Sequence, residues 1–313
     1  MQRLKELVLY RGRVSVNAPV VPCAPVPFIV GVARSGTTLL RLMLDAHCDM
    51  AIPPETHFVP HSINASRRRM RPRAAFMRAL ATNALWPDQE VDQAELEAIL
   101  DQVDPFDVGQ ALRAFYRAYA ARFGKTRWGD KTPNYVTQMD VIQSALPEAR
   151  FVHIIRDGRD VVLSAKDTWF GPNSVEEGAR WWADQIATAR SLAPKLAHYL
   201  EVRYEDLVLD TETTLRRVCD FIELDWDPAM LAYHERAPGR MAEMDRNIII
   251  GDKVVATGSD RERIHRLTSK PPQPQRVYRW KSEMGPGELN SFEKVAGDTL
   301  NDLGYETRQI ERR

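Results

Sequence analysis

One segment has the residue types and spacing needed to bind a phosphate group. The residues Gly31–Thr38 read G-V-A-R-S-G-T-T and lie between the apolar run Phe28–Val32 and a leucine-rich stretch. A small-residue turn between a strand and a helix points backbone N–H groups at an anion. The spacing therefore predicts a phosphate-binding loop. The alternative is a glycine turn with ordinary helix capping by Ser35 or Thr38.

This loop differs from the loop of nucleoside-triphosphate enzymes. Those enzymes place a lysine after the second glycine, where it reaches the β- and γ-phosphates. Here Thr37 takes that place, and the basic residue Arg34 stands two positions before Gly36. No aspartate at the end of an apolar strand accompanies the loop as a convincing magnesium ligand. A donor without a γ-phosphate, and without a required Mg²⁺, fits these residues better than ATP.

A second anion-binding pattern follows the apolar run Arg150–Ile155. Arg156 comes directly after the run, and Ser164 lies eight residues later in a stretch with a helical pattern. Arginine offers a planar fork of donors and serine a hydroxyl. Ligands of open α/β sheets bind at the carboxyl ends of the strands, so two such sites suit a donor with two separated phosphate-type groups. Alternatively, Arg156 forms a surface ion pair with Asp157, Asp160 or another nearby carboxylate.

Apolar runs and helical patterns alternate along the chain. Strands are predicted at Phe28–Val32, Met50–Ile52, Arg127–Gly129, Arg150–Ile155 and Leu200–Tyr204, after a proline-rich extended lead-in over residues 19–27. Helical patterns follow the first loop, resume at Asp160 and include Trp181–Leu192. This alternation predicts an α/β fold with a central parallel sheet flanked by helices.

Two longer segments complete a single domain spanning 1–313. Residues 60–123 are charged and mainly helical, and we expect them to form an insertion packed over the strand ends. Residues 251–281 are rich in Arg, Lys, Pro and Gly without clear periodicity. Long loops of this kind often act as lids. Both segments are expected to shape the acceptor pocket.

Composition excludes several classes of protein. Hydrophobic residues make up 44% and charged residues 27% of the chain, as in soluble globular proteins. The formal net charge is zero, so we expect no nucleic-acid partner. Three scattered cysteines favour a reducing compartment over a disulfide framework. No run approaches the roughly 18 apolar residues that span a bilayer, and the start lacks a signal-peptide pattern. These features predict a cytoplasmic protein.

Two charged or amphipathic segments leave a membrane contact open as an alternative. The basic run Arg67–Arg73 is interpreted as a solvated face, with contact to an anionic acceptor or a lipid headgroup as the alternative. Residues 1–11 could make an amphipathic contact with a membrane surface. The sequence does not predict an oligomeric state.

Taken together, the motifs resemble those of the sulfotransferases that use 3′-phosphoadenosine 5′-phosphosulfate (PAPS). F-I-V-G-V-A-R-S-G-T-T-L-L-R begins at Phe28, I-I-R-D-G-R-D-V-V-L-S at Ile154 and R-Y-E-D-L at Arg203. R-S-G-T-T-L-L-R-L-M-L-D-A-H followed by P-P-E-T is closer to the tyrosylprotein and bacterial-type branch than to the cytosolic aryl branch. The matches run from about residue 28 to 208, and loosely to 281. The resemblance implies a P-loop-like, three-layer fold.

The resemblance also implies which residues bind the donor. The 5′-phosphosulfate would be held by the first motif, with Arg34 on the transferring group: Arg34, Ser35, Gly36, Thr37 and Thr38. Arg156 and Ser164 would hold the 3′-phosphate, and Tyr204 would lie beside the nucleotide or be a buried strand aromatic. Family members close a basic loop over the 3′-phosphate, here at Arg276, Arg279, Trp280 and Lys281. The full Arg-Lys-Gly form of the cytosolic branch is missing there.

Glu55 stands where this branch places its catalytic glutamate, just after Pro53-Pro54. An acceptor hydroxyl loses a proton as it attacks sulfur, and a nearby carboxylate can take that proton. His57 is the rival base and Asp130 a weaker one. Lys131, in W-G-D-K-T-P, resembles a lysine that lies near the donor in the tyrosylprotein branch, and it would share the stabilisation of developing charge with Arg34.

The predicted reaction is an in-line displacement at sulfur without a metal. His57 and His61 have the spacing of a metal pair, but Pro60 between them and the lack of further ligands disfavour zinc. The expected acceptor is a hydroxyl on a small molecule, a glycolipid or a phenol. Two alternatives are a P-loop kinase that uses ATP–Mg²⁺ on a small molecule and a non-catalytic nucleotide-binding protein.

Overall fold

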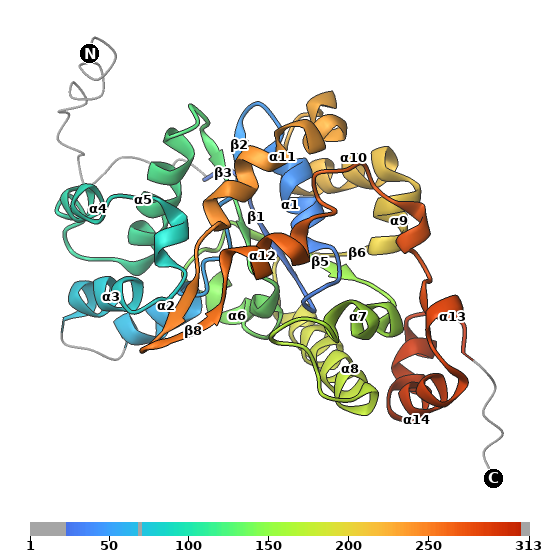
Figure 1. Ribbon diagram of the computed structural model, residues 1–313. Helices are drawn as coiled ribbons and strands as arrows, with labels where there is room; N and C mark the ends of the chain where they lie inside the picture. The colour runs from blue at the N-terminus through green and yellow to red at the C-terminus, as the bar shows by residue number, and fades with distance from the viewer. Residues whose placement is uncertain (1–22, 68–70, 308–313) are drawn as a thin grey trace.

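The computed structural model describes residues 23–67 and 71–307 (Figure 1). Within these residues the strands are β1 (Val26–Gly31), β2 (Met50–Ala51), β3 (Arg127–Trp128), β4 (Asp130–Lys131), β5 (Ala149–Ile155), β6 (Tyr199–Arg203), β7 (Ile248–Ile250) and β8 (Lys253–Ala256). The α-helices are α1 (Thr37–Asp45), α2 (Val59–Arg67), α3 (Pro72–Ala81), α4 (Gln93–Leu100), α5 (Val108–Ala121), α6 (Met139–Gln143), α7 (Gly158–Ala165), α8 (Val175–Leu192), α9 (Tyr204–Leu209), α10 (Thr211–Ile222), α11 (Tyr233–Met241), α12 (Gly258–His265), α13 (Trp280–Glu283) and α14 (Pro286–Asp302).

The central sheet is parallel throughout, with the strand order β4-β1-β5-β6. Two smaller sheets accompany it in the described part of the chain: the parallel pair β2-β3 and the antiparallel hairpin β7-β8. Helices cover both faces of the central sheet (Figure 1). The predicted three-layer α/β fold with a central parallel sheet is therefore confirmed.

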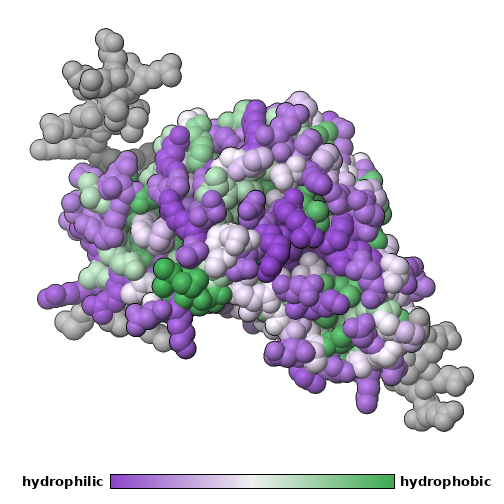
Figure 2. Space-filling view, in the orientation of Figure 1, coloured by the Kyte–Doolittle hydropathy of each residue, from purple (hydrophilic) through white to green (hydrophobic). Residues whose placement is uncertain are grey.

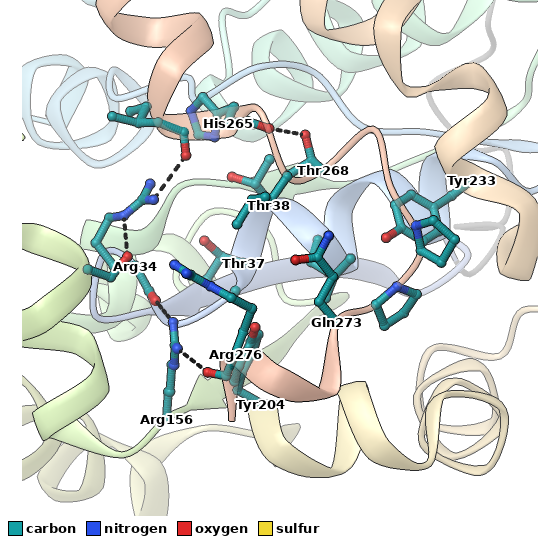
Figure 3. A pocket seen from close by; sticks show the side chains of 17 residues that line it. Arg34, Thr37, Thr38, Arg156, Tyr204, Tyr233, His265, Thr268, Gln273 and Arg276 are labelled. Atoms are coloured by element: carbon teal, nitrogen blue, oxygen red, sulfur yellow. Dashed lines mark hydrogen bonds between the residues drawn. The ribbon is translucent and has the colours of Figure 1, made fainter. Parts of the chain in front are cut away.

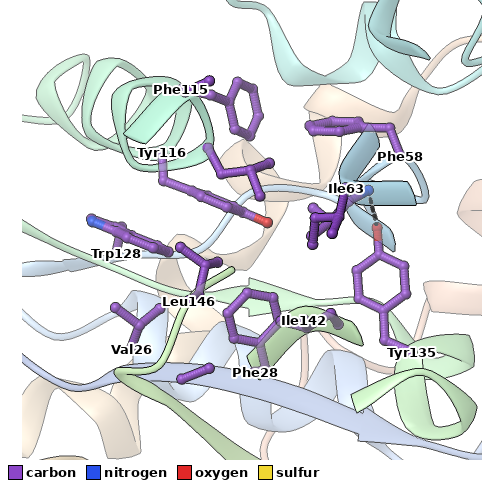
Figure 4. Packing of buried hydrophobic residues seen from close by; sticks show 14 of the residues in the cluster. Val26, Phe28, Phe58, Ile63, Phe115, Tyr116, Trp128, Tyr135, Ile142 and Leu146 are labelled. Carbon is purple, nitrogen blue, oxygen red and sulfur yellow. Dashed lines mark hydrogen bonds between the residues drawn. The ribbon is translucent and has the colours of Figure 1, made fainter. Parts of the chain in front are cut away.

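All six residues of β1 are buried, and alternate side chains reach opposite layers. Phe28 and Val30 belong to one core with residues of α2, α3, α5 and α6, whereas Ile29 belongs to a second core with residues of α1, α9, α10 and α11. In the first core the rings of Tyr116 and Trp128 are stacked with centroids 4.4 Å apart (Figure 4). A strand covered on both faces reads as a continuous apolar run, which is why β1 was predictable.

The segment over residues 60–123 is mainly helical, as expected, and contains nearly all of α2 together with α3, α4 and α5. It does more than cover strand ends, because Tyr116 of α5 packs edge-on against Phe28 of β1 with ring centroids 6.4 Å apart. The basic run Arg67–Arg73 falls partly outside the described residues, and residues 1–11 lie wholly outside them. Among the described helices, none combines the length and apolarity needed to cross a bilayer.

Three local predictions were wrong. Val26 and Pro27 belong to β1 rather than to an extended lead-in. The pairing of β1 with β4 starts only at Phe28, so the missing N–H of Pro27 removes no hydrogen bond between these two strands. Tyr204 starts α9 instead of ending β6.

The third correction concerns residues 251–281, which are not a structureless loop. They contain β8, α12 and the first two residues of α13. The hydroxyl of Thr257 accepts the N–H of Asp260, whose carboxylate accepts the N–H of Thr257 in return. This reciprocal capping satisfies two N–H groups that would otherwise lack partners and starts α12 in a segment without apolar periodicity.

Candidate active site

The predicted phosphate loop joins β1 to α1 in a backbone conformation that requires glycine at one position. Gly36 has a φ of 97°, and a Cβ added there would lie 2.4 Å from the ring of Tyr204. Gly36 is also the N-cap residue of α1, and no side chain caps this helix. The first N–H groups of α1 are therefore available to an anion.

This helix end opens into a cavity, here called the donor cavity (Figure 3). Its lining comes from the phosphate loop and the start of α1, the end of β5, the last turn of α7, the starts of α9 and α11, and the end of α12 with the segment after it. The residues are Arg34, Gly36, Thr37, Thr38, Leu39, Arg156, Ser164, Tyr204, Tyr233, Ile264, His265, Leu267, Thr268, Pro271, Pro272, Gln273 and Arg276. Of the described residues that line it, none is an aspartate or a glutamate.

Arg34 and Arg156 of the donor cavity each donate hydrogen bonds to neutral oxygen atoms. Arg34 Nε donates to Ser164 Oγ at 3.2 Å, and its Nη2 donates to the carbonyl of Ile264 at 2.9 Å. Arg156 donates to the carbonyls of Arg34 and Arg276 at 3.1 and 2.8 Å, and its guanidinium lies 4.2 Å from the ring centre of Tyr204. These contacts fix the direction of both guanidinium groups across the cavity.

Three arginines, Arg34, Arg156 and Arg276, line the donor cavity. Burial, together with the nearby Arg156, lowers the pKa of Arg34 to about 10. Burial and the neighbouring Arg279 and Arg156 also lower the pKa of Arg276. Within the described part of the chain, neither Arg34 nor Arg276 forms an ion pair with a carboxylate, whereas Arg156 lies 3.4 Å from Asp160. An anion in this cavity would relieve the repulsion among the arginines.

Glu55 lies beside the donor cavity, at the centre of a second charged group. Its Oε1 accepts a hydrogen bond from Lys131 Nζ at 2.6 Å, and its Oε2 lies 2.9 Å from His57 Nε2. Lys131 Nζ also donates to Thr38 Oγ1 at 3.3 Å, which links the group to the phosphate loop. Burial alone would raise the pKa of the Glu55 carboxyl, but the charge of Lys131 and the hydrogen bond with His57 hold this pKa well below its usual value.

Asp130 is buried next to the site and accepts hydrogen bonds there. Its Oδ2 accepts hydrogen bonds from the hydroxyls of Thr56 and Tyr116, both at 2.8 Å, and burial raises its pKa. The N–H of Thr56 donates to Thr132 Oγ1 at 3.0 Å. Asp130 and Thr132 thus fix the backbone next to Glu55. Asp130 does not line either cavity at the site, so its position suits an anchoring role better than that of a base.

A second cavity of about 340 Å³, here called the acceptor cavity, lies on the other side of Arg34 and Thr38. Glu55 and His57 both line it. The remaining lining is mostly apolar and comes from distant segments: Leu85, Pro133, Trp169, Phe170, Trp181, Met244, Ile248 and Ile264. Glu55 therefore belongs to the acceptor cavity and is linked through Lys131 to Thr38, which lines both cavities.

The structure brings together most of the residues predicted for the donor. Arg34, Gly36, Thr37, Thr38, Arg156, Ser164 and Tyr204 line the donor cavity. Ser35 is buried within the loop, and its Oγ has no partner among the described residues. Glu55 and Lys131 form the ion pair described above.

Three residues predicted for the basic loop line neither cavity. Trp280 is buried against Arg159, whose guanidinium lies 3.5 Å from the indole ring centre. The exposed Lys281 pairs with Glu306 at 2.6 Å. Arg279 pairs with Glu283 at 2.5 Å. From this segment, Arg276 is the residue that reaches the donor cavity.

Sequence reasoning missed several lining residues. His265 lines both cavities, and burial, with the nearby charges of Lys131 and Arg34, keeps its pKa well below the usual value. Tyr233 and Gln273 complete the far end of the donor cavity. The capping pair of Thr257 and Asp260 was the one local signal for α12, the helix that ends at His265.

Comparisons with known proteins agree with this geometry. The model of the sulfotransferase family matches residues 25–228. Protein-tyrosine sulfotransferase 1 of Danio rerio is 27% identical over 295 residues, covering 90% of this chain and 72% of the relative. Nodulation protein NoeE of Sinorhizobium fredii is 28% identical over 317 residues, covering 93% and 68%.

Two solved structures share the fold. The sulfotransferase domain from the curacin biosynthetic pathway has a TM-score of 0.60 at 17% identity and covers 91% of this chain and 99% of its own. The sulfotransferase domain from the Synechococcus PCC 7002 olefin synthase has a TM-score of 0.57 at 23% identity and covers 91% and 96%. The family match spans the phosphate loop, Glu55, Lys131 and Arg156. This chain therefore belongs to the sulfotransferase family.

Proposed function

We propose that this chain transfers the sulfuryl group of PAPS to an acceptor hydroxyl, with Glu55 as the base. The observation that carries the proposal is the donor cavity itself. Three arginines and the uncapped start of α1 surround one space, and its described lining contains no carboxylate. Such a site is suited to a ligand with several anionic groups.

The residues present fit the two ends of PAPS. The 5′-phosphosulfate would lie on the N–H groups at the start of α1, with the unpartnered Ser35 Oγ nearby and Arg34 on the sulfuryl group. The 3′-phosphate would be held by Arg156 and Ser164. Arg156 Nε has no partner among the described residues, so it has a donor to spare. Arg276 would add a further cation from the segment after α12.

Glu55 would take the proton of the acceptor hydroxyl. The acceptor oxygen forms a bond to sulfur while the bond from sulfur to the bridging phosphate oxygen breaks, and adenosine 3′,5′-bisphosphate leaves. A hydroxyl oxygen becomes strongly acidic as it bonds to sulfur, so a carboxylate of low pKa can still accept its proton. The low pKa of Glu55 keeps it ionised and ready for this step.

Arg34 and Lys131 would stabilise the charge that develops on the leaving oxygen. Lys131 contacts both Glu55 and Thr38, so its ammonium lies between the base and the phosphate loop. Donors fixed before the reaction need little rearrangement as the charge develops. As in phosphoryl transfer, positioning and electrostatics would carry most of the catalysis.

A kinase that uses ATP–Mg²⁺ is a poorer fit to these side chains. Kinases hold Mg²⁺ with carboxylate ligands beside the phosphates. Asp160 already accepts the backbone N–H of Trp280 and a 3.4 Å hydrogen bond from Arg156. Glu55 is paired with Lys131. The donor cavity thus supplies cations where a magnesium site needs anions.

Replacing Lys131 by methionine should move the acidic limb of the pH–rate profile. In the native protein the pKa of Glu55 is held well below 4.5, so the base form persists on acidification and is lost only near that low pKa. The charge of Lys131 is the largest influence that lowers this pKa, so its removal raises the pKa of Glu55. The profile of kcat/KM should then fall at a higher pH than in the native protein. Lys131→Arg, which keeps the cation, should leave the acidic limb of the profile at the native low pH. If the acidic limb does not move in Lys131→Met, Glu55 is not the titrating base.

Transfer of labelled sulfate tests the proposed reaction directly. The full chain is mixed with PAPS labelled with ³⁵S and a panel of phenols, alkanols and glycosides, and the sulfated product and the released bisphosphate are both measured. The proposal predicts equal amounts of the two products without added Mg²⁺. Release of bisphosphate that matches free sulfate and no acceptor product would contradict a transferase.

A further inference from the structure

The acceptor cavity has an apolar wall with aromatic side chains at its rim. Trp169 and Phe170 form an edge-to-face pair with ring centroids 5.1 Å apart, and they are 37% and 41% exposed. Trp181 of α8 and Ile248 of β7 line the same cavity. A volume of about 340 Å³ admits a small ligand or one end of a larger one.

The charged side chains in this cavity already have partners. The guanidinium of Arg261 forms an ion pair with the carboxylate of Asp88 at 2.5 Å and donates to the carbonyl of Arg246 at 3.1 Å. His57 and Lys131 both contact Glu55. Apart from Arg34, which also faces the donor, the cavity therefore offers little to an acidic or highly charged acceptor. An apolar group is the better match.

The apolar surface continues from the cavity onto the hairpin β7-β8. Ile248 lines the cavity, and the next residues, Ile249 and Ile250, are 52% and 61% exposed. Val254 pairs with Ile249 across the hairpin and is 54% exposed, and Val255 is 41% exposed. Figure 2 shows a hydrophobic patch where Figure 1 places this hairpin. Successive side chains of a strand point to opposite faces, so Ile249 and Val254 share one face of the hairpin. Ile250 and Val255 lie on the other face with Ile248, where they extend the apolar lining of the cavity.

The tip of the hairpin is polar, which argues against insertion into a bilayer. Strands β7 and β8 are joined by Gly251 and Asp252, and Lys253 follows at once. A hairpin that enters a membrane by its tip would bring these two charges into hydrocarbon at high cost. The flanks of the hairpin are apolar and its tip is not, so the hairpin suits a hydrocarbon chain of a ligand that lies along it.

We propose that the acceptor is a hydroxylated amphiphile whose hydroxyl enters the acceptor cavity and whose hydrocarbon chain lies along the face of the hairpin that carries Ile250 and Val255. This inference rests on the proposed function for the reaction at the hydroxyl. It adds the substrate class: a molecule with an extended apolar chain next to its acceptor group. The aromatic rim would hold the first part of the chain and the hairpin the rest.

Binding of primary alkanols tests the inference without depending on turnover. The dissociation constants of the series from butanol to decanol are measured by calorimetry on the full chain, with and without adenosine 3′,5′-bisphosphate. Burial of each methylene is worth up to about fourfold in affinity. We expect decanol to bind at least tenfold more tightly than hexanol. Equal affinities for the two would overturn the proposal.

Substitution of the exposed hairpin side chains tests where the hydrocarbon chain of the alkanol binds. A variant with Ile249→Thr, Ile250→Thr, Val254→Thr and Val255→Thr keeps β-branched side chains that favour strands, and thermal unfolding checks its fold. The dissociation constant of hexanol should then exceed that of decanol by only about threefold or less. Leu209→Thr is the matched control, because Leu209 is 59% exposed on α9, across the molecule from the hairpin (Figure 1); the ratio should stay as in the native chain.

Two other outcomes would overturn the proposal. If the variant with four threonine substitutions keeps the native ratio of the hexanol and decanol dissociation constants, the hydrocarbon chain of the alkanol lies elsewhere. If the ratio is kept and the variant instead loses binding to phosphatidylcholine vesicles, or changes from dimer to monomer in sedimentation, the patch serves a bilayer or a second copy. Failure of the proposed function is measured separately. If the protein does not bind adenosine 3′,5′-bisphosphate, the proposed donor site is contradicted, whatever affinities the alkanols show.

Discussion

Glu55→Gln is expected to lower kcat by about 10²- to 10⁴-fold, the range in which a lost general base falls. Glutamine has the same shape, and its amide oxygen can still accept the hydrogen bond from Lys131. It cannot accept a proton from the acceptor. The affinity for adenosine 3′,5′-bisphosphate should stay within about threefold, because Glu55 lines the acceptor cavity and not the donor cavity. A transfer assay and calorimetry on the same preparation separate the two effects.

The control for this prediction is Glu262→Gln. Glu262 is an exposed glutamate on α12 that lines neither the donor nor the acceptor cavity. Its substitution should leave both kcat and bisphosphate affinity within about twofold. If Glu55→Gln retains more than a tenth of the native kcat, another base carries the proton. His57, 2.9 Å from Glu55 and lining the same cavity, would then be the candidate.

Arg156→Ala should weaken the binding of adenosine 3′,5′-bisphosphate by about 10²- to 10⁴-fold. A hydrogen bond to a charged group is worth about 1.5–3 kcal/mol, and the fork of Arg156 can make two of them to one phosphate. The guanidinium also holds the carbonyls of Arg34 and Arg276, so its loss loosens the cavity wall. Calorimetric titration measures the change.

Adenosine 5′-monophosphate is the matched ligand for this variant, because it lacks the 3′-phosphate. Its affinity should change by less than about tenfold in Arg156→Ala. Arg156→Lys, which keeps the charge but not the fork, should bind the bisphosphate with intermediate affinity. Equal losses for both nucleotides would show that Arg156 supports the fold of the site and does not recognise the 3′-phosphate.

The sequence was sufficient for the sheet and for the residues nearest to it. β1 and β5 are apolar runs that end in a glycine turn and an arginine, so their identity and their shared edge could be predicted. Arg34 and Ser164 were both predicted to lie near that edge, in separate anion sites, and the structure joins them by a hydrogen bond across 130 residues. In each case the local pattern and the fold point to the same arrangement.

The far wall of the site could not be predicted, because it depends on contacts across the whole chain. The carbonyl of Ile264 reaches Arg34 over 230 residues, and no pattern in the segment 251–281 marks that contact. Trp280 was predicted at the donor, but the flat guanidinium of Arg159 gives its indole a buried partner. Arg159 is in turn fixed by Asp157 and Glu293. Packing of this kind is invisible to motif spacing.

Hairpin β7-β8 shows a further limit of the sequence. Its runs I-I-I and K-V-V-A would fit a buried strand as well as an exposed one. Their exposure follows from the tertiary structure, since the pair forms its own sheet apart from β1 and β5. The apolar surface beside the acceptor cavity therefore became visible only in the structure.

Calorimetric titration of the full chain with adenosine 3′,5′-bisphosphate, adenosine 5′-monophosphate and ATP–Mg²⁺ tests the central claim most directly. Three arginines around the start of α1 predict that the bisphosphate binds at least about 100-fold more tightly than the monophosphate and more tightly than ATP–Mg²⁺. Tighter binding of ATP–Mg²⁺ than of the bisphosphate would contradict a PAPS site and favour a kinase.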